Sequence, residues 1–444
     1  MNLKKTLIAA MGAAVLAAPL VAAPVLSSTA EAAAEQFFPM IIYRTGAYAV
    51  GGIPLANGYG DYLKLLNARD GGINGVKIKF EECETQYSTK VGVECYEKLK
   101  GKGDVGPTVF NPNSTGITYA IIPKASVDKV PVHSMGYGRT AAGDGRVFPW
   151  AFTFPTSYWS QAAAFINYIG EREGGKNNLK GKKIAFIYHN SGYGKEPLPT
   201  FNKLAKKYGY DFKALAVDHP GQEQKATWLQ VRRKRPDWVF MSGWGVMNQV
   251  AIKEANGIGY PMDKFVGNWW SGSDADVIPA GDGSIGYKST NMHAAGTGYP
   301  VFKDIIKHVY GGDAAKAKAN NVGEVLYNRM INTYTFATEA VRDAVKAAGG
   351  KRPTGDQVRA AFENLDMTEE RLAARGIGGF TWPLKVSCKN HEGNAPGVFI
   401  QQWDGKKWKL ISDFIPAMSD VVRPMVEKAA AAYAKENKIK PRSC

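Results

Sequence analysis

The stretch "KKIAFIYHNSGYGK", residues 182–195, holds the pattern on which the predicted fold depends. Its first half is an apolar run typical of a buried strand, and a turn with Gly192 and Gly194 follows at once. Glycine lets the backbone turn sharply and approach another group, while Tyr193 between the two glycines offers a flat apolar ring and a hydroxyl. The stretch therefore predicts a strand whose carboxyl end carries a residue suited to contact a ligand.

Helical and apolar segments alternate on both sides of this strand. Repeated alternation of this kind is typical of parallel sheets covered by helices. In the second half of the chain, we expect helices at 160–173, 197–210, 226–235 and 247–260, and strands at 182–189, 211–219, 236–244 and 264–270. In the first half, we expect helices at 57–72, 92–103 and 117–129, and strands at 36–43, 76–82, 104–110 and 130–135.

The length of 444 residues exceeds what one core usually supports, so two lobes are expected. The two α/β series in tandem agree with this expectation. Parallel sheets bind ligands at the carboxyl ends of their strands, and two facing lobes place these ends along a shared cleft. The predicted class is therefore α/β, with a ligand site between two lobes.

The predicted strand ends are rich in glycine, hydroxyl and aromatic residues. They comprise Tyr43–Tyr48, Asn111–Gly116, Ser134–Arg139, Asn190–Tyr193, Gly243–Gly245 and Asn268–Ser271. Ser114 and Thr115 precede a predicted helix, whose first N–H groups can bind a carboxylate. The alternative for either residue alone is that it only caps the helix. The recurrence at six strand ends favours a binding site.

The first 34 residues are typical of a secretory signal peptide. Lys4 and Lys5 precede a long run of Ala, Leu and Val, and Ala32–Ala34 fits a cleavage site. An uncleaved membrane anchor is the alternative, but Pro19 and Pro24 disfavour it. We therefore expect export to the periplasm. The formal net charge is +16, yet the basic residues are scattered apart from the predicted helix end at 231–235, and we expect no nucleic-acid partner.

The four cysteines are expected to form disulfides in an oxidising compartment. Their order along the chain favours a local bridge between Cys83 and Cys95 and a second bridge between Cys388 and Cys444, although three connectivities are possible. No C-x-x-C motif is present, and the sequence around Cys388 offers too few ligands for a metal.

Motifs of common enzyme classes lack a supporting context. G-x-G-x-x-G occurs at 101–106 and 281–286, but neither copy follows a predicted strand and opens a helix. The chain has no G-x-S-x-G, H-E-x-x-H or P-loop motif, and its six histidines are scattered singly. We therefore expect neither enzymatic activity nor a cofactor.

The ordered set of motifs resembles the periplasmic solute-binding proteins of branched-chain amino acid ABC importers. The resemblance is carried by "TGAYAVGG" (45–52), "DVGPTVFNPNSTG" (104–116), "KKIAFIYHNSGYGK" (182–195), "DWVFMSGWG" (237–245) and "FVGNWW" (265–270), and it covers essentially the whole chain after the signal peptide. It implies a type I periplasmic binding fold of two Rossmann-like lobes joined by three crossovers. The implied lobes are 35–154 with 288–380, and 155–287 with 381–444.

The resemblance also implies roles for individual residues. Asn113, Ser114 and Thr115 align with the loop that takes the ligand carboxylate, and Gly136 to Gly138, with Tyr137 between them, align with a second carboxylate loop. Tyr193 and Trp244 match aromatic residues that pack on the ligand from the second lobe. The alternative for Tyr193 is a buried aromatic at a turn.

One departure from the family pattern concerns the ligand. Amino-acid binders usually place an acid after the strand written here as "FVG", where it pairs with the ammonium group, but this chain continues with Asn268, Trp269 and Trp270. Asp274 and Asp276 are possible substitutes or solvated loop acids. An unpaired buried ammonium is costly, so we expect an aromatic or other small carboxylate rather than an ordinary amino acid.

Further ligand contacts follow from residue type. Trp244, Trp269, Trp270, Tyr48 and Tyr137 favour a flat ligand body, and Arg44 is a candidate to bind a second polar end. Arg44 has a surface ion pair as its alternative. The expected partners are thus a small solute and the transmembrane subunits of an ABC permease. The alternative function for a protein with the same cleft is that of a ligand-sensing receptor component.

Overall fold

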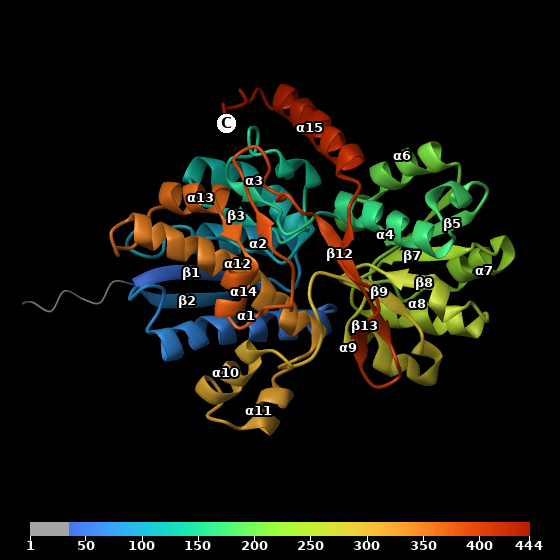
Figure 1. The fold of residues 1–444 in the computed structure, drawn as a ribbon, viewed down its shortest axis with the longest axis horizontal. Helices are drawn as coiled ribbons and strands as arrows, with labels where there is room; N and C mark the ends of the chain where they lie inside the picture. The colour runs from blue at the N-terminus through green and yellow to red at the C-terminus, as the bar shows by residue number, and fades with distance from the viewer. Residues whose placement is uncertain (1–34) are drawn as a thin grey trace, which may run out of the picture. The chain divides into compact units, whose positions relative to one another are not determined.

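The computed structural model describes residues 35–444, which belong to one compact unit (Figure 1). The predicted signal peptide, residues 1–34, lies outside the described residues. Two parallel-dominated sheets, each with its own helices, make up the unit. We call the elements around the first sheet lobe 1 and those around the second sheet lobe 2.

The first sheet is parallel. β1 (Glu35–Ile42) pairs with β2 (Lys77–Glu84), and β3 (Val132–His133) pairs with β4 (Ala151–Phe152). Single bridges from Phe37 and Met40 to Pro107 and Asn111, and from Phe110 to Val132, join these pairs through residues 107–111. Helices alternate with these parallel strands along the chain, as in βαβ units. They are α1 (Ala49–Asp70), α2 (Thr89–Leu99) and α3 (Thr115–Asp128).

The second sheet is larger, with the strand order β13-β12-β9-β8-β7-β5-β6. Its parallel strands are β5 (Lys183–His189), β6 (Asp211–Val217), β7 (Trp238–Ser242), β8 (Phe265–Gly267) and β9 (Lys288–Asn291). β12 (Gly397–Trp403) joins antiparallel, followed by β13 (Trp408–Leu410) and β14 (Ile415–Pro416). The helices of this lobe are α4 (Tyr158–Arg172), α5 (Gly192–Lys195), α6 (Leu198–Tyr208), α7 (Lys225–Lys234), α8 (Val246–Gly257) and α9 (Asp274–Val277).

After β9 the chain returns to lobe 1. The elements here are α10 (Pro300–His308), α11 (Ala314–Ala319), α12 (Val325–Ala347), α13 (Gly355–Glu363), β10 (Asp366–Met367), α14 (Glu369–Ala374) and β11 (Leu384–Lys385). α12 packs along α1, where the rings of Tyr334 and Tyr59 stack with centroids 3.6 Å apart. Short 3₁₀ helices lie at Thr140–Gly143, Lys176–Leu179, Met262–Lys264 and Ile278–Ser284.

The last helix, α15 (Ser419–Glu436), follows the strands of lobe 2 and packs against both lobes, on the 3₁₀ helix Thr140–Gly143 of lobe 1 and on α4 of lobe 2 (Figure 1). Its residues Ala430 and Ala434 share a buried cluster with Ile122 and Phe148, and Tyr433 stacks on Phe148. Cys388 and Cys444 form a disulfide that holds the end of the chain, and Cys83 pairs with Cys95. Both bridges favoured by the order of the cysteines are therefore present.

The structure confirms the predicted class of two parallel α/β units in tandem. The chain passes between the lobes from β4 to α4, from β9 to α10 and from β11 to β12. The exact lobe boundaries expected from the sequence stay a prediction. Within residues 35–444, none of the helices combines the length and apolar character needed to cross a bilayer.

Candidate ligand-binding site

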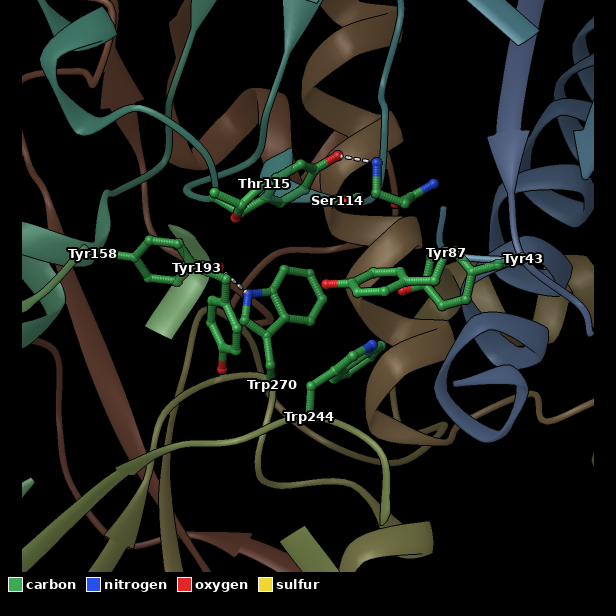
Figure 2. A pocket seen from close by; sticks show the side chains of 10 residues that line it. Tyr43, Tyr87, Ser114, Thr115, Tyr158, Tyr193, Trp244 and Trp270 are labelled. Carbon is green, nitrogen blue, oxygen red and sulfur yellow. Dashed lines mark hydrogen bonds between the residues drawn. The ribbon is translucent and has the colours of Figure 1, made fainter. Parts of the chain in front are cut away.

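A small pocket lies where the strand ends of both lobes face each other (Figure 2). Ten residues line it: Tyr43, Tyr87, Asn113, Ser114, Thr115, Tyr137, Tyr158, Tyr193, Trp244 and Trp270. The first lobe supplies Tyr43, Tyr87, the run 113–115 and Tyr137, each in the loop that follows a strand or bridged segment. The site therefore lies at the carboxyl ends of parallel strands, as in other open α/β sheets.

The amino terminus of α3 forms the polar part of the lobe 1 wall. Ser114 is the N-cap residue, and its Oγ accepts a hydrogen bond from the N–H of Ile117 at 3.5 Å. The first N–H groups of a helix have no partner within the helix, so those of Thr115 and Gly116 remain available to a ligand. Together with the hydroxyls of Ser114 and Thr115, they make a neutral set of donors for an anion.

A buried network fixes the loop before α3. Asn113 has a positive φ of 51°, and its Nδ2 donates to the carbonyl of Ile41 at 3.0 Å. The hydroxyl of Tyr137 donates to Asn111 Oδ1 and accepts from the N–H of Asn113. Burial raises the pKa of Tyr137 well above its usual value. Because that hydroxyl is already bonded within the protein, Tyr137 presents its ring to the pocket.

Tyr193 on the lobe 2 wall is held in the same way. Its hydroxyl donates to the carbonyl of Gly243 at 2.9 Å and accepts from Asn268 Nδ2 at 2.7 Å. The turn that carries it requires glycine at position 194, since a Cβ there would lie 2.0 Å from the carbonyl oxygen of His189. The ring of Tyr193, 5.4 Å from that of Tyr158, therefore faces the pocket while its hydroxyl does not (Figure 2).

Two indoles complete this wall. Trp270 donates from Nε1 to the hydroxyl of Tyr158 at 2.8 Å, and its ring stands edge-on to that of Trp244 at 5.6 Å (Figure 2). The Nε1 of Trp244 is buried and has no hydrogen-bond partner among residues 35–444. Trp244 also reaches across to α1, where a Cβ on Gly51 would lie 2.5 Å from its ring. The aromatic wall is thus packed against both lobes.

None of the ten lining residues carries a charged side chain. Asn268 follows β8, where the family resemblance predicts an acid in amino-acid binders, and it is hydrogen-bonded to Tyr193 and Ser242. Asp276 is buried, accepts hydrogen bonds from Ser273 and Asn248, and has its pKa raised to about 6 by burial. Asp274 lines a different cavity. Neither aspartate therefore reaches the pocket to substitute for the missing acid.

Four of the predicted contacts do not line the pocket, and Arg44 is the clearest correction. Its guanidinium pairs with both carboxylate oxygens of Glu82 at 2.7 and 2.8 Å and donates to Asn57 Oδ1 at 2.7 Å. These bonds occupy it at the edge of lobe 1, and they hold its pKa above the ordinary value. Arg44 thus forms a surface ion pair, which is the alternative role that its sequence position also allows.

Tyr48, Gly136 and Trp269 lie beside the pocket rather than in its lining. The hydroxyl of Tyr48 lies 3.0 Å from His189 Nε2 and 2.8 Å from His219 Nδ1, so it joins the two lobes. Trp269 stacks on Tyr158 with centroids 5.3 Å apart. Gly136 has a φ of +82°, and a Cβ there would lie 2.6 Å from the carbonyl oxygen of Thr156. All three residues support the pocket indirectly.

Two residues that line the pocket, Tyr87 and Tyr158, are not among the contacts predicted from the sequence. Tyr43 and Trp270 lie in the predicted strand ends, and Trp270 is also among the aromatic residues expected to favour a flat ligand body. Tyr87 follows the end of β2, and Tyr158 opens the helix after β4. Applying the strand-end rule to every predicted strand, including 76–82, would have found Tyr87.

Hydrogen bonds between the lobes also hold them together. Glu196 of lobe 2 accepts hydrogen bonds from the hydroxyl of Tyr119 on α3 and from Thr140 Oγ1, the latter at 2.6 Å. With the Tyr48 contacts and the packing of Trp244 on α1, they enclose the pocket between the lobes. The molecule is thus in a closed arrangement.

Two α/β lobes that close on a pocket at their strand ends define the class of two-lobed solute-binding proteins. Residues 35–409 match the family model for "Periplasmic binding protein", and the chain belongs to this family. No curated protein gave a match.

Solved structures show the same type I periplasmic binding fold. One, described as an ABC transporter permease from the Pseudomonas fluorescens group, is 42% identical, covers 92% of this chain and 99% of its own, and has a TM-score of 0.86. A branched-chain amino acid ABC transporter protein from Thermus thermophilus with bound valine is 21% identical, covers 88% of this chain and 98% of its own, and has a TM-score of 0.71. A solute-binding protein from R. palustris in complex with benzoate is 16% identical, covers 87% of this chain and 97% of its own, and has a TM-score of 0.67.

Proposed function

We propose that this protein is the extracytoplasmic substrate-binding component of an ABC importer. It captures a small carboxylate in the pocket between its lobes and delivers the closed complex to the transmembrane subunits of a permease. No bond is made or broken, because the binding energy only shifts the equilibrium between open and closed arrangements. The signal-like residues 1–34 support an extracytoplasmic location.

The observation that carries the proposal is the pairing of opposed walls in one enclosed pocket. Lobe 1 offers the hydroxyls of Ser114 and Thr115 and the first N–H groups of α3, while lobe 2 offers the rings of Tyr193, Trp244 and Trp270. A solute that uses both walls gains most of its contacts only when the lobes are closed, which couples capture to closure.

The chemistry of the walls points to a solute without an ammonium group. The lining holds no acid to pair with a cation, and burying an unpaired ammonium costs a large part of any binding energy. A carboxylate attached to an apolar or aromatic body meets donors at one end and rings at the other.

Isothermal titration calorimetry of residues 35–444 with benzoate, 3-methylbutanoate and valine tests the proposal. We expect a defined heat of binding for at least one of the two carboxylates, accompanied by a rise in melting temperature. X-ray scattering should show that the same carboxylate makes the protein more compact. Absence of binding and of closure for all three solutes would contradict the proposed function.

A further inference from the structure

Arg329 is a buried cation directly behind the pocket. It lies on α12 with none of its side chain exposed, and its Cζ is 5.1 Å from the centroid of the Trp270 ring. Trp270 lines the pocket, so one indole ring separates this guanidinium from the ligand space. The sequence gives no hint of this proximity, since the two residues are 59 positions apart.

The hydrogen bonds of Arg329 go only to neutral groups. Nε donates to His293 Nε2 at 2.9 Å, and Nη2 donates to Asn291 Oδ1 at 2.6 Å. His293 Nδ1 bonds the carbonyl of Ala294, which fixes the ring as a neutral acceptor at Nε2. Burial and the guanidinium itself hold the pKa of His293 well below its usual value. Nη1 of Arg329 is buried and has no hydrogen-bond partner in residues 35–444.

Arg329 makes no ion pair with any carboxylate within the described part of the chain. The nearest acid on its own helix turn is Glu324, whose Oε2 instead accepts the N–H groups of Leu326 and Tyr327. Burial, reinforced by the neighbouring Asp274, raises the pKa of Glu324 to about 8. Burial also lowers the pKa of Arg329 to about 9, against the opposing effect of Glu324, and the guanidinium keeps its charge.

A buried charge with no carboxylate at ion-pair distance is unfavourable, and an anion placed nearby relieves this cost. We propose that Arg329 is a specificity-determining residue that selects an anionic ligand, acting through the Trp270 ring rather than by direct contact. The inference rests on the proposed function and names the charge of its solute. It also excludes a cationic ligand, because the aromatic lining would otherwise suit a quaternary ammonium group.

A matched pair of probes isolates this electrostatic role. Benzoate and benzamide have the same shape and differ in charge, so their dissociation constants at pH 7 report the preference of the pocket for an anion. For the wild-type protein we expect benzoate to bind at least about tenfold more tightly than benzamide, the scale of a charge pair across one buried ring. This measurement needs no variant and remains available if a variant fails to fold.

Arg329→Met removes the charge, and Arg329→Lys keeps it. We expect R329M to weaken the binding of benzoate by about tenfold and to change the dissociation constant of benzamide by less than about threefold. The ratio of the two dissociation constants should therefore fall close to one. R329K should retain most of the ratio. An equal loss for both probes in R329M would show a merely structural role, and an unchanged ratio would show no electrostatic role, so either result overturns the inference.

The wild-type titrations separate this inference from the proposed function. Tighter binding of benzamide, or binding of valine but not of benzoate, would overturn the anion preference while leaving a solute-binding protein. Failure of every probe, with no closure in X-ray scattering, would instead remove the proposed function itself.

Discussion

Polar side chains on the two walls of the pocket serve different purposes. On the lobe 1 wall, Ser114 and Thr115 keep hydroxyl and N–H groups available to a ligand. On the lobe 2 wall, the polar atoms of Tyr193 and Trp270 are already bonded to Gly243, Asn268 and Tyr158. The comparison teaches that a polar side chain in a pocket lining is not by itself a polar contact, because its hydroxyl can serve only to orient its ring.

The largest expected effect tests how the lobe 2 wall is built. We expect Gly194→Val to lower the free energy of unfolding by about 3 kcal/mol, because its Cβ would clash with the carbonyl oxygen of His189 and displace Tyr193. Urea denaturation measures the loss. Gly192→Ala is the matched control, since its Cβ would meet only ordinary contacts, the nearest at 3.7 Å. Equal stability of the two variants would show that this wall does not depend on the glycine turn.

The next prediction compares the removal of one hydroxyl group from each wall of the pocket. Thr115→Val removes a hydroxyl that is offered to the ligand, so benzoate binding should weaken about tenfold, or about 1.4 kcal/mol, with little change in stability. Tyr193→Phe removes a hydroxyl that is bonded within the protein. It should lower the free energy of unfolding by about 1 kcal/mol and change benzoate affinity by less than about threefold. The reverse pattern in calorimetry and denaturation would break the comparison of the walls.

A third prediction concerns the contact that joins the lobes beside the pocket. Burial lowers the pKa of His189 to about 3, and it also lowers that of His219 despite the opposing effect of Asp218. An unfolded histidine has a pKa of about 6.5 and binds more protons than the folded one between these values. The stability contributed by neutral His189 is therefore complete above about pH 6.5 and is lost as the pH falls, by up to about 1.4 kcal/mol per pH unit.

Melting temperatures at pH 7.5 and 5.5 measure this dependence. His133, His293 and His391 are also buried with lowered pKa values, so the wild-type protein loses stability in acid for several reasons. His189→Gln removes one of these buried histidines. Between pH 7.5 and 5.5, the free energy of unfolding of this variant should fall by about 1 kcal/mol less than that of the wild type. The same acid loss in both proteins would show that the Tyr48 contact is not sensitive to protonation.

The smallest effect is expected at Arg44. Since its guanidinium pairs with Glu82 at the partly exposed edge of lobe 1, Arg44→Gln should cost less than about 1 kcal/mol of stability. Benzoate affinity should not change, because Arg44 does not line the pocket. A loss of affinity above about fivefold would restore Arg44 as a ligand contact and extend the polar wall.

Much of the fold could be predicted because each strand and helix leaves a local pattern. The apolar run at 183–189 and the helix after it are both present, as is the cap formed by Ser114. Part of the site followed from the rule that parallel strands carry ligands at their carboxyl ends. Asn113, Ser114, Thr115, Tyr137, Tyr193 and Trp244, chosen by this rule and by the family resemblance, all line the pocket.

The rest of the site could not be predicted, because neighbouring residues in a loop point in different directions. Trp269 and Trp270 are adjacent and chemically identical, yet only Trp270 lines the pocket while Trp269 stacks on Tyr158. Arg44 directly follows Tyr43, but it turns to Glu82 because β2 pairs with β1 and brings that acid alongside. Backbone dihedrals and distant partners decided both cases.

The sequence by itself determined the alternation of strands and helices and the strand ends that line the pocket, since these depend on neighbours along the chain, whereas it left three ways of pairing the cysteines open. Only the tertiary structure decided which aromatic rings face the pocket and placed Arg329 of α12 behind Trp270. The physical reason is that burial and electrostatic pairing act through space, between groups that the chain brings together only when both lobes are folded and closed.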